Sequence, residues 1–313
     1  MKAYMDFADV YDELMDDVPY EEWCEEIDCL IHKYGISRPE GRSEEEAGQA
    51  LSEEEKCLKM ERNLVLDLGC GTGNMTHLLY QKGYDMIGID SSERMLELAA
   101  AKREANGEDI LYLQQDMRQL DLYSTIGTVV SVCDCMNYIL EEEELLGVFS
   151  LVRNYLYPGG IFIFDFNTVY KYEVVMGNST IAENREDCSF IWENYYDPET
   201  FLNEYDLTVF VRQEEEELFR KFEETHIQRG YTLEQITGLL KKAGLQILEA
   251  KDCDTGMYYP AEDNRAGNGS SQETAEEDAE ETVAEGAERI RIVCKKSESD
   301  AVNGIQNRSF FQC

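Results

Sequence analysis

The chain has no run of apolar residues long enough to cross a membrane, which requires about 20 in succession. Its first residues, MKAYMDFADVYDEL, are acidic and aromatic and contain no apolar block like that of a signal peptide. With 43% hydrophobic residues among 313, there is still ample material for a core. These features predict a cytoplasmic globular protein without a membrane partner.

Basic residues are scarce. The chain carries 28 Lys and Arg against 66 Asp and Glu, which gives a formal net charge of −38. Binding to nucleic acid normally starts from a basic surface that attracts phosphates. The charge balance therefore counts against a nucleic-acid partner and favours a small molecule or, second, a protein.

Paired cysteine motifs are also missing. There are ten cysteines, but no C-x-x-C pair and no Cys/His cluster at zinc spacing, and Cys133 and Cys135 are only two residues apart. Since nothing points to export, we expect reduced thiols rather than disulfides, and no metal site.

The most informative segment that is present spans residues 64–76, LVLDLGCGTGNMT. A strand-like run containing Asp67 leads into alternating glycines, and a helical pattern follows. Glycine adopts positive φ and lets a ligand approach the backbone without a Cβ in the way. A second acid, Asp90, ends the next apolar run. A glycine turn between strand and helix, with an acid at the tip of the next strand, indicates a cofactor that contains adenosine.

The glycine spacing narrows this choice. Gly69, Gly71 and Gly73 form G-x-G-x-G, whereas the dinucleotide fingerprint G-x-G-x-x-G would need glycine at Asn74. With an acid two residues ahead and a third acid, Asp116, further along, the motif resembles the DxGxGxG motif of the class I S-adenosylmethionine-dependent methyltransferases. The resemblance covers most of the chain and implies methyl transfer from S-adenosylmethionine.

Apolar runs and helical stripes alternate along the chain and predict an α/β fold. Strands are expected at residues 64–68, 86–89, 110–113, 128–133, 161–164, 245–250 and 289–293. This alternation predicts a doubly wound, mostly parallel seven-stranded sheet with helices on both faces, the Rossmann-like fold of the resembled family.

After the fifth strand the period of the pattern changes to two. Residues 189–196, 203–212 and 218–225 alternate apolar and polar side chains, which predicts an inserted antiparallel β cap. We therefore expect an N-terminal helical cap with an acidic insertion, an α/β domain that binds S-adenosylmethionine, an antiparallel cap or lid, and a loose tail. The corresponding ranges are 1–60, 61–168 with 230–296, 169–229, and 297–313.

Two acidic segments interrupt this pattern, at residues 43–56 and 261–287. The second carries nine Asp and Glu against one Arg and almost no large apolar residue. Such a composition cannot bury enough surface to offset its ordering entropy, so we expect a disordered acidic loop.

The serial acids have distinct roles in the resembled family. A ribose diol needs a bidentate acceptor, and Asp90 matches the family's ribose-binding acid; it is also a plausible helix N-cap. Asp116 matches the acid that accepts from the adenine amino group, and Asp67 the acid near the amino-acid end of the cofactor. The residues that we expect to bind S-adenosylmethionine are Tyr11, Asp67, Gly69, Gly71, Gly73, Asp90, Ser91, Met95, Asp116, Met117 and Cys133.

Aromatic residues near the N-terminus also have two interpretations. The segment resembles a helix that folds over the cofactor in many relatives, which would place Tyr4, Tyr11 or Tyr20 near the cationic sulfonium. Equally, these tyrosines suit ordinary packing anchors.

The catalytic residue is hard to predict, because methyl transfer can depend mainly on positioning. A base is needed only when the acceptor must lose a proton. Asp134 is a candidate cofactor contact, and Asn137 and Tyr138 are candidates to face the substrate. Tyr138 and His226 are the candidate catalytic residues, and the acceptor itself is not identified.

Two alternatives stay open at this point. One is a non-catalytic module that binds S-adenosylmethionine and recruits a partner through its acidic loops. The other is a nucleotide-dependent oxidoreductase, against which Asn74 and the lack of a Tyr-x-x-x-Lys pair both count.

Overall fold

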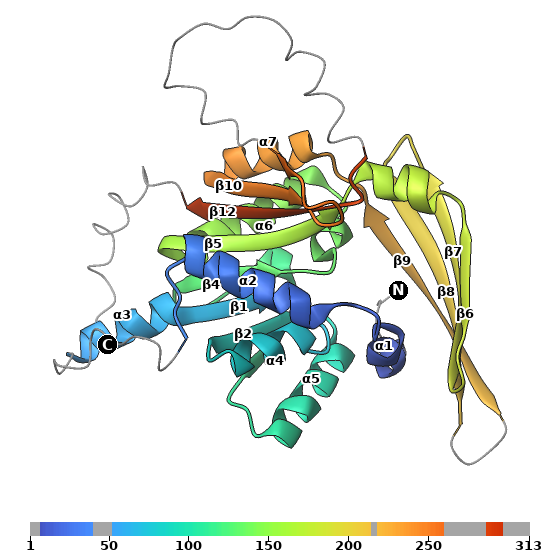
Figure 1. The fold of residues 1–313 in the computed structure, drawn as a ribbon, viewed down its shortest axis with the longest axis horizontal. Coiled ribbons are helices and arrows are strands. Elements are labelled where there is room, and N and C mark those ends of the chain that lie inside the picture. The colour runs from blue at the N-terminus through green and yellow to red at the C-terminus, as the bar shows by residue number, and fades with distance from the viewer. Residues whose placement is uncertain (1–6, 40–51, 214–217, 260–285, 297–313) are drawn as a thin grey trace, which may run out of the picture.

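The computed structural model describes residues 7–39, 52–213, 218–259 and 286–296. Within them, a central sheet of eight strands has the order β11-β10-β12-β5-β4-β1-β2-β3 (Figure 1). The strands are β1 Leu64–Leu68, β2 Asp85–Asp90, β3 Leu111–Gln114, β4 Ile126–Ser131, β5 Leu156–Asn167, β10 Leu245–Asp252, β11 Tyr258–Tyr259 and β12 Arg289–Lys296.

Helices cover both faces of the sheet because its central strands are apolar on both sides. In β5, for example, Phe162 and Phe164 belong to one core cluster, and Ile161 and Ile163 to the other. Helices α6 and α7 pack on the phenylalanine side, and α2 and α4 pack on the opposite side. The helices are α1 Ala8–Leu14, α2 Tyr20–Tyr34, α3 Glu53–Asn63, α4 Asn74–Gln81, α5 Glu93–Asn106, α6 Glu142–Tyr155 and α7 Leu233–Ala243.

The predicted doubly wound, mostly parallel sheet is confirmed, but the expected number of seven strands is wrong. Strands β1 to β5 are parallel, and β12 runs antiparallel between β5 and β10. The eighth strand is β11, which pairs with the end of β10 through Tyr258 and Tyr259 alone. A strand of two residues is too short to produce a recognisable period in the sequence.

The predicted antiparallel cap is present and has four strands rather than three. Its order is β6-β7-β8-β9. The strands are β6 Thr180–Asn184, β7 Cys188–Asp197, β8 Leu202–Arg212 and β9 Phe219–Arg229. The extra strand, β6, is exposed along its whole length, so it lacks the alternation of buried and exposed residues that identifies the other three.

Helix α1 lies between the α/β body and the cap sheet (Figure 1). Its Val10 packs with Tyr205, Leu207 and Val209 on the inner face of the cap. From the other side of the helix, Asp12 accepts hydrogen bonds from the glycine-turn region of the body, described below. The helix therefore connects the two sheets.

The acidic segments lie mostly outside the described residues. Of the predicted insertion 43–56, the described part begins at Ser52, which forms a capping box with Glu55 and starts α3. The proposed disordered loop and the tail fall almost wholly within residues 260–285 and 297–313, which are not described. No helix in the described ranges is long and apolar enough to cross a membrane.

Candidate active site

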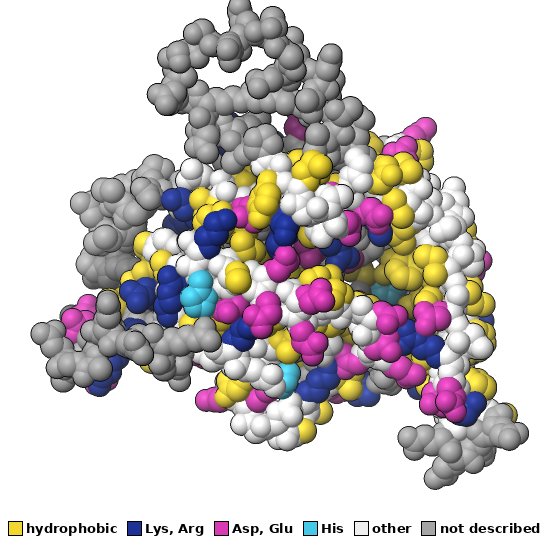
Figure 2. All heavy atoms as spheres, in the orientation of Figure 1, with side chains coloured by type: hydrophobic (Ala, Val, Ile, Leu, Met, Phe, Trp, Pro, Cys, Tyr) yellow, Lys and Arg dark blue, Asp and Glu magenta, His cyan; other side chains and the backbone are white. Residues whose placement is uncertain are grey.

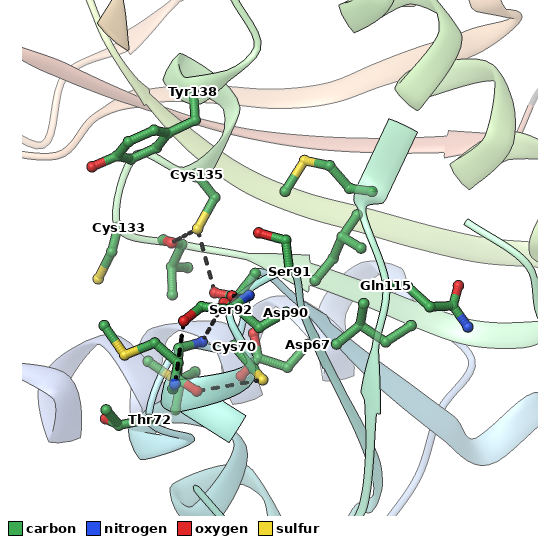
Figure 3. A pocket seen from close by; sticks show the side chains of 18 of the residues that line it. Asp67, Cys70, Thr72, Asp90, Ser91, Ser92, Gln115, Cys133, Cys135 and Tyr138 are labelled. Atoms are coloured by element: carbon green, nitrogen blue, oxygen red, sulfur yellow. Dashed lines mark hydrogen bonds between the residues drawn. The ribbon is translucent and has the colours of Figure 1, made fainter. Parts of the chain in front are cut away.

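A cavity of about 730 Å³ lies at the carboxyl ends of β1, β2 and β4 (Figure 3). The strand order switches direction at β1, which pairs with β2 on one side and with β4 on the other. Ligands of open α/β sheets bind at such switch points. The residues predicted to bind cofactor that line this cavity are Tyr11, Asp67, Gly69, Gly71, Asp90, Ser91, Met95, Asp116, Met117 and Cys133.

The glycine turn after β1 forms the floor of the cavity. The backbone N–H groups of Gly69 and Cys70 donate to the carbonyl of Ile89, at 2.8 and 2.9 Å, which fixes the turn against β2. A Cβ on Gly69 would lie 2.6 Å from Cys135 Sγ. Around Gly71, with φ of 54°, no atom lies within 4 Å of the Cβ position. Both glycines line the cavity, but the Cβ position of Gly71 is open, whereas that of Gly69 is filled by Cys135.

Gly73, the remaining residue predicted to bind cofactor, does not line the cavity. It is the N-cap of α4, with φ of 81°. A Cβ there would lie 2.5 Å from the hydroxyl of Tyr112 and 3.2 Å from Cβ of Ala99. Gly73 thus serves close packing of the helix against its neighbours.

Asp90 is held in place at the end of β2. Its carboxylate accepts from the backbone N–H of Gly71 at 2.9 Å and of Ser92 at 2.8 Å. A carboxylate offers about four lone-pair positions, so acceptor capacity is left for a diol. Burial raises its pKa. The N-cap of α5 is Ser92, so the alternative of Asp90 as the N-cap is wrong.

Asp67 is the most deeply buried acid at the site. It is 1% exposed and accepts a hydrogen bond of 2.5 Å from Thr76 Oγ1 on α4. Burial raises its pKa to about 7, and the neighbouring Asp90 contributes in the same direction. Asp67 is therefore protonated over much of the pH range below about 7.

At the far end of the cavity, Asp116 and Met117 begin a short 3₁₀ turn after β3. The Asp116 carboxylate forms a bidentate pair with Arg118, with distances of 2.6 to 3.1 Å. This hydrogen bonding lowers the pKa of Asp116. An ionised hydrogen-bond acceptor therefore lines the cavity.

The turn after β4 contains two residues with strained backbones. Cys133 and Asp134 have φ of 61° and 51°, in the left-handed region that non-glycine residues rarely occupy. Both backbone N–H groups donate to the carboxylate of Asp165, at 3.1 and 2.7 Å. Asp165 lies on β5 and is 5% exposed. This buried carboxylate holds the turn in a conformation that places Cys133 and Cys135 along the cavity.

Two residues of this turn do not reach the cavity as expected. Asp134 accepts from Gln228 of the cap at 2.5 Å and pairs with Arg289 of β12 at 3.0 Å. Asn137 is fully buried, and its amide bonds the backbone of Asn167 and Arg229. Both side chains join the cap to the body, and neither lines the cavity; their contacts with cofactor and substrate stay predictions.

Tyr138 and His226 come together although 88 residues separate them. Tyr138 lines the cavity, and its hydroxyl lies 3.3 Å from His226 Nδ1. His226 itself is 2% exposed and does not line the cavity. His32 and His77 lie elsewhere and pair with Asp28 and Glu108.

From the N-terminal region, Tyr11 and Tyr20 both line the cavity, while Tyr4 lies outside the described residues. Sequence reasoning did not find the role of Asp12 on α1. Its carboxylate accepts from Thr72 Oγ1 at 2.6 Å and from Asn74 Nδ2 at 2.9 Å, and pairs with Lys102. These contacts dock α1 on the glycine turn.

Three thiols surround the cavity floor: Cys70, Cys133 and Cys135. Burial raises the pKa of each. Protonated thiols are weak nucleophiles and weak metal ligands. The described cysteines are all free, and no cluster able to hold a metal ion occurs in the described part of the chain.

The fold and this site define a class I S-adenosylmethionine-dependent methyltransferase, and the chain belongs to that family. A family model described as a methyltransferase domain matches residues 65–160. The chain is 34% identical over 245 residues to the "Putative methyltransferase YqeM" of Bacillus subtilis (strain 168), covering 78% of this chain and 87% of that one. It is 31% identical to "Putative methyltransferase GWCH70_2453" of Geobacillus sp. (strain WCH70), covering 79% and 90%.

Solved structures agree with this assignment. An S-adenosylmethionine-dependent methyltransferase from Clostridium acetobutylicum superimposes with a TM-score of 0.68 at 27% identity, covering 95% of this chain and all of the other. The CcbJ methyltransferase of Streptomyces caelestis shares the fold, with a TM-score of 0.63 at 17% identity over 89% of this chain and 96% of its own. Family membership sets aside the oxidoreductase alternative.

The cavity fits S-adenosylmethionine, the cofactor of this family. Its volume lies within the usual range for sites of small molecules. The open face of Gly71 admits close approach of a ligand. The fixed carboxylate of Asp90 suits a ribose diol, and the tyrosines from the N-terminal region suit a cationic sulfonium.

The first prediction concerns Asp165. We expect Asp165→Asn to lower the free energy of unfolding by about 1–3 kcal/mol, because one buried N–H loses its acceptor. It should also weaken S-adenosylhomocysteine binding at least tenfold, measured by calorimetry, because the turn at Cys133 shifts. The matched control is Asp252→Asn: Asp252 is equally buried and accepts two backbone N–H groups, but in the turn after β10. The control should lose stability and keep its affinity; equal affinities in both variants would contradict the role given to Asp165.

The second prediction concerns pH. Because the folded pKa of Asp67 is raised to about 7, its proton stabilises the folded protein below about pH 4. That contribution, at most about 4 kcal/mol, is lost as the pH rises to 7. Asp67→Asn has no proton to lose, so urea unfolding at pH 4 to 8 should show the variant gaining stability relative to the wild type as pH rises. A difference that is constant with pH would mean that Asp67 ionises normally.

Proposed function

We propose that this protein transfers the methyl group of S-adenosylmethionine to a small-molecule acceptor. The observation that carries the proposal is the concave cavity, which is lined by turns of the α/β body and by Tyr11 of helix α1. Helix α1 is docked on the glycine turn through Asp12, and the cap sheet is joined to the turn after β4 through Gln228 and Asp134. A cavity of about 730 Å³ suits a small molecule better than the surface of a folded protein.

Charge supports the same choice. Figure 2 shows Asp and Glu side chains interspersed with Lys and Arg over one face of the molecule, and the chain as a whole carries 66 acidic against 28 basic residues. Of the basic residues that line the cavity, Arg94 and Arg118 are paired with Glu97 and Asp116. No basic patch is therefore available along this cavity for a phosphate backbone.

The positions of the residues support the cofactor roles that the family resemblance implies. Asp90 would accept from the ribose diol, and Asp116 from the adenine amino group. The backbone at Gly69 and Gly71, with Asp67 behind it, would face the amino-acid end. Ser91, Met95, Met117, Cys133 and Tyr11 would complete the walls. When bound, S-adenosylmethionine supplies an electrophilic methyl group, and these residues supply its position relative to the acceptor.

The function is tested with S-adenosylmethionine labelled in its methyl group. We expect label to appear in the small-molecule fraction of a bacterial metabolite extract, together with S-adenosylhomocysteine. The parallel reactions contain total RNA and total protein in place of the metabolites. Label entering RNA or protein instead would overturn the small-molecule proposal. Binding of S-adenosylhomocysteine without transfer in any of the three would favour the non-catalytic alternative.

A third prediction tests the floor of the cavity. We expect Gly71→Ala to weaken S-adenosylhomocysteine binding at least tenfold, because the added Cβ occupies space where the ligand approaches. Gly107→Ala is the control: Gly107 has φ of 67°, also has no atom within 4 Å of its Cβ position, and lies at the end of α5 away from the cavity. Both should lose about 1 kcal/mol of stability from backbone strain. Unchanged affinity in Gly71→Ala would show that the cofactor does not approach this turn.

A further inference from the structure

A chain of polar side chains leads from the cavity into the cap. The Tyr138 hydroxyl lies 3.3 Å from His226 Nδ1 and 3.0 Å from the Tyr205 hydroxyl. On the other side of the imidazole, His226 Nε2 lies 3.3 Å from Glu224 Oε2. The members come from the turn after β4 and from β8 and β9, so folding of the cap on the body brings them together.

The surroundings fix the orientation of the imidazole. The His226 ring stacks on Tyr205, with centroids 4.9 Å apart and planes within 5°. The Phe7 ring packs edge-on against it. Glu224 is 8% exposed, and its second oxygen accepts from the backbone N–H of Phe7 at 2.9 Å. The imidazole is thus held between an aromatic ring and a carboxylate that is itself anchored.

This arrangement selects one tautomer. The Glu224 carboxylate accepts only, so it favours a proton on His226 Nε2. Nδ1 is then the acceptor for the hydroxyl of Tyr138. Of the three, only Tyr138 lines the cavity, so it is the member that an acceptor can touch.

We propose that Tyr138, His226 and Glu224 form a proton relay that takes a proton from a protic acceptor, an O–H or N–H compound, as it is methylated. This rests on the proposed function. The acceptor's oxygen or nitrogen forms a bond to the methyl carbon, and the carbon–sulfur bond breaks with its electron pair left on sulfur. The acceptor's proton passes to the Tyr138 oxygen while the phenolic proton passes to His226 Nδ1.

The resulting imidazolium is paired with the Glu224 carboxylate and later loses its proton to water. Tyr138 is the catalytic residue in this scheme, since it touches the acceptor. His226 acts through Tyr138. Glu224 orients the imidazole and stabilises its protonated form. The arrangement is that of the Ser-His-Asp triad, with a phenol in place of the serine hydroxyl and proton removal in place of nucleophilic attack.

The relay also defines the kind of acceptor. Titratable groups that contact His226 include Tyr138, Tyr205 and Glu224. Beyond them lies Asp134, which accepts from Gln228 on the same strand as His226 and is paired with Arg289. Tyr138, Tyr205 and Glu224 carry no positive charge that would attract an anionic acceptor, and the charge of Arg289 is paired with Asp134. We therefore assign a neutral or cationic acceptor with an ionisable proton, rather than a carboxylate, a phosphate or a thiolate.

The test uses His226→Asn, whose amide oxygen can accept from Tyr138 but cannot take its proton. Transfer of label from S-adenosylmethionine into the metabolite extract should fall about 100-fold or more in kcat in His226→Asn and in Tyr138→Phe. The wild-type rate should rise with pH through the ionisation of the relay, and His226→Asn should lack that rise. Tyr84→Phe is the control, because it removes a buried hydroxyl bonded to Asp28 at the amino end of β2, and Tyr84 does not line the cavity.

Two further measurements separate the relay from the proposed function. S-adenosylhomocysteine should bind His226→Asn as it binds the wild type, which shows that the cofactor site is intact. Nitrogen NMR of the three histidines, assigned by the signal missing in His226→Asn, should show His226 protonated at Nε2, with a Nδ1 signal that moves in Tyr138→Phe. This measurement needs no acceptor.

The outcomes are distinct. Wild-type transfer into RNA or protein overturns the small-molecule function. Normal transfer by His226→Asn, a reduced rate with an unchanged pH profile, or a proton on Nδ1 overturns the relay while leaving the function in place. Retained S-adenosylhomocysteine binding with loss of both the rate and the pH-dependent rise supports the relay.

Discussion

A single buried carboxylate holds the site together. Asp165 accepts both backbone N–H groups of a turn that would otherwise be strained, with Cys133 and Asp134 at positive φ. Strain of this kind persists only where the surrounding structure over-determines it, and it is typical of functional sites. Because the turn is fixed, Asp134 faces Gln228 of the cap and Arg289 of β12. The position of the cap over the cavity therefore follows from a contact within the parallel sheet.

Helix α1 supplies the second connection. Asp12 docks on Thr72 and Asn74 beside the glycine turn, and the Phe7 backbone donates to Glu224 beneath His226. One short helix thus contacts both the glycine turn, which forms the floor of the cavity, and Glu224, the carboxylate of the proposed relay. A helix of seven residues has little stability of its own, so its order depends on these tertiary contacts. Displacing α1 would open the cavity and remove a partner of Glu224 in the same movement.

Sequence patterns predicted the features that depend on neighbours in the chain. The buried strands and the glycine turn are both local signals. The structure brings ten of the eleven proposed cofactor residues to one cavity. Contacts between residues far apart in the sequence were not predicted. Asp12 accepts from Thr72, 60 positions away, and Glu224 accepts from the backbone of Phe7, 217 positions away. Gly73 and Asn137 have residue types that suit a ligand, but in this structure Gly73 lies against Tyr112 and Ala99, and Asn137 is buried.

The cofactor end and the acceptor end of the proposed site are built from different parts of the chain. The proposed cofactor contacts, apart from Tyr11, lie between residues 67 and 133, within the parallel part of the sheet and its turns. The proposed acceptor end combines Tyr138 with side chains of β8 and β9. Substitutions on the inner face of the cap can therefore change which acceptor is held against Tyr138, while the geometry that holds the methyl donor stays fixed by the sheet.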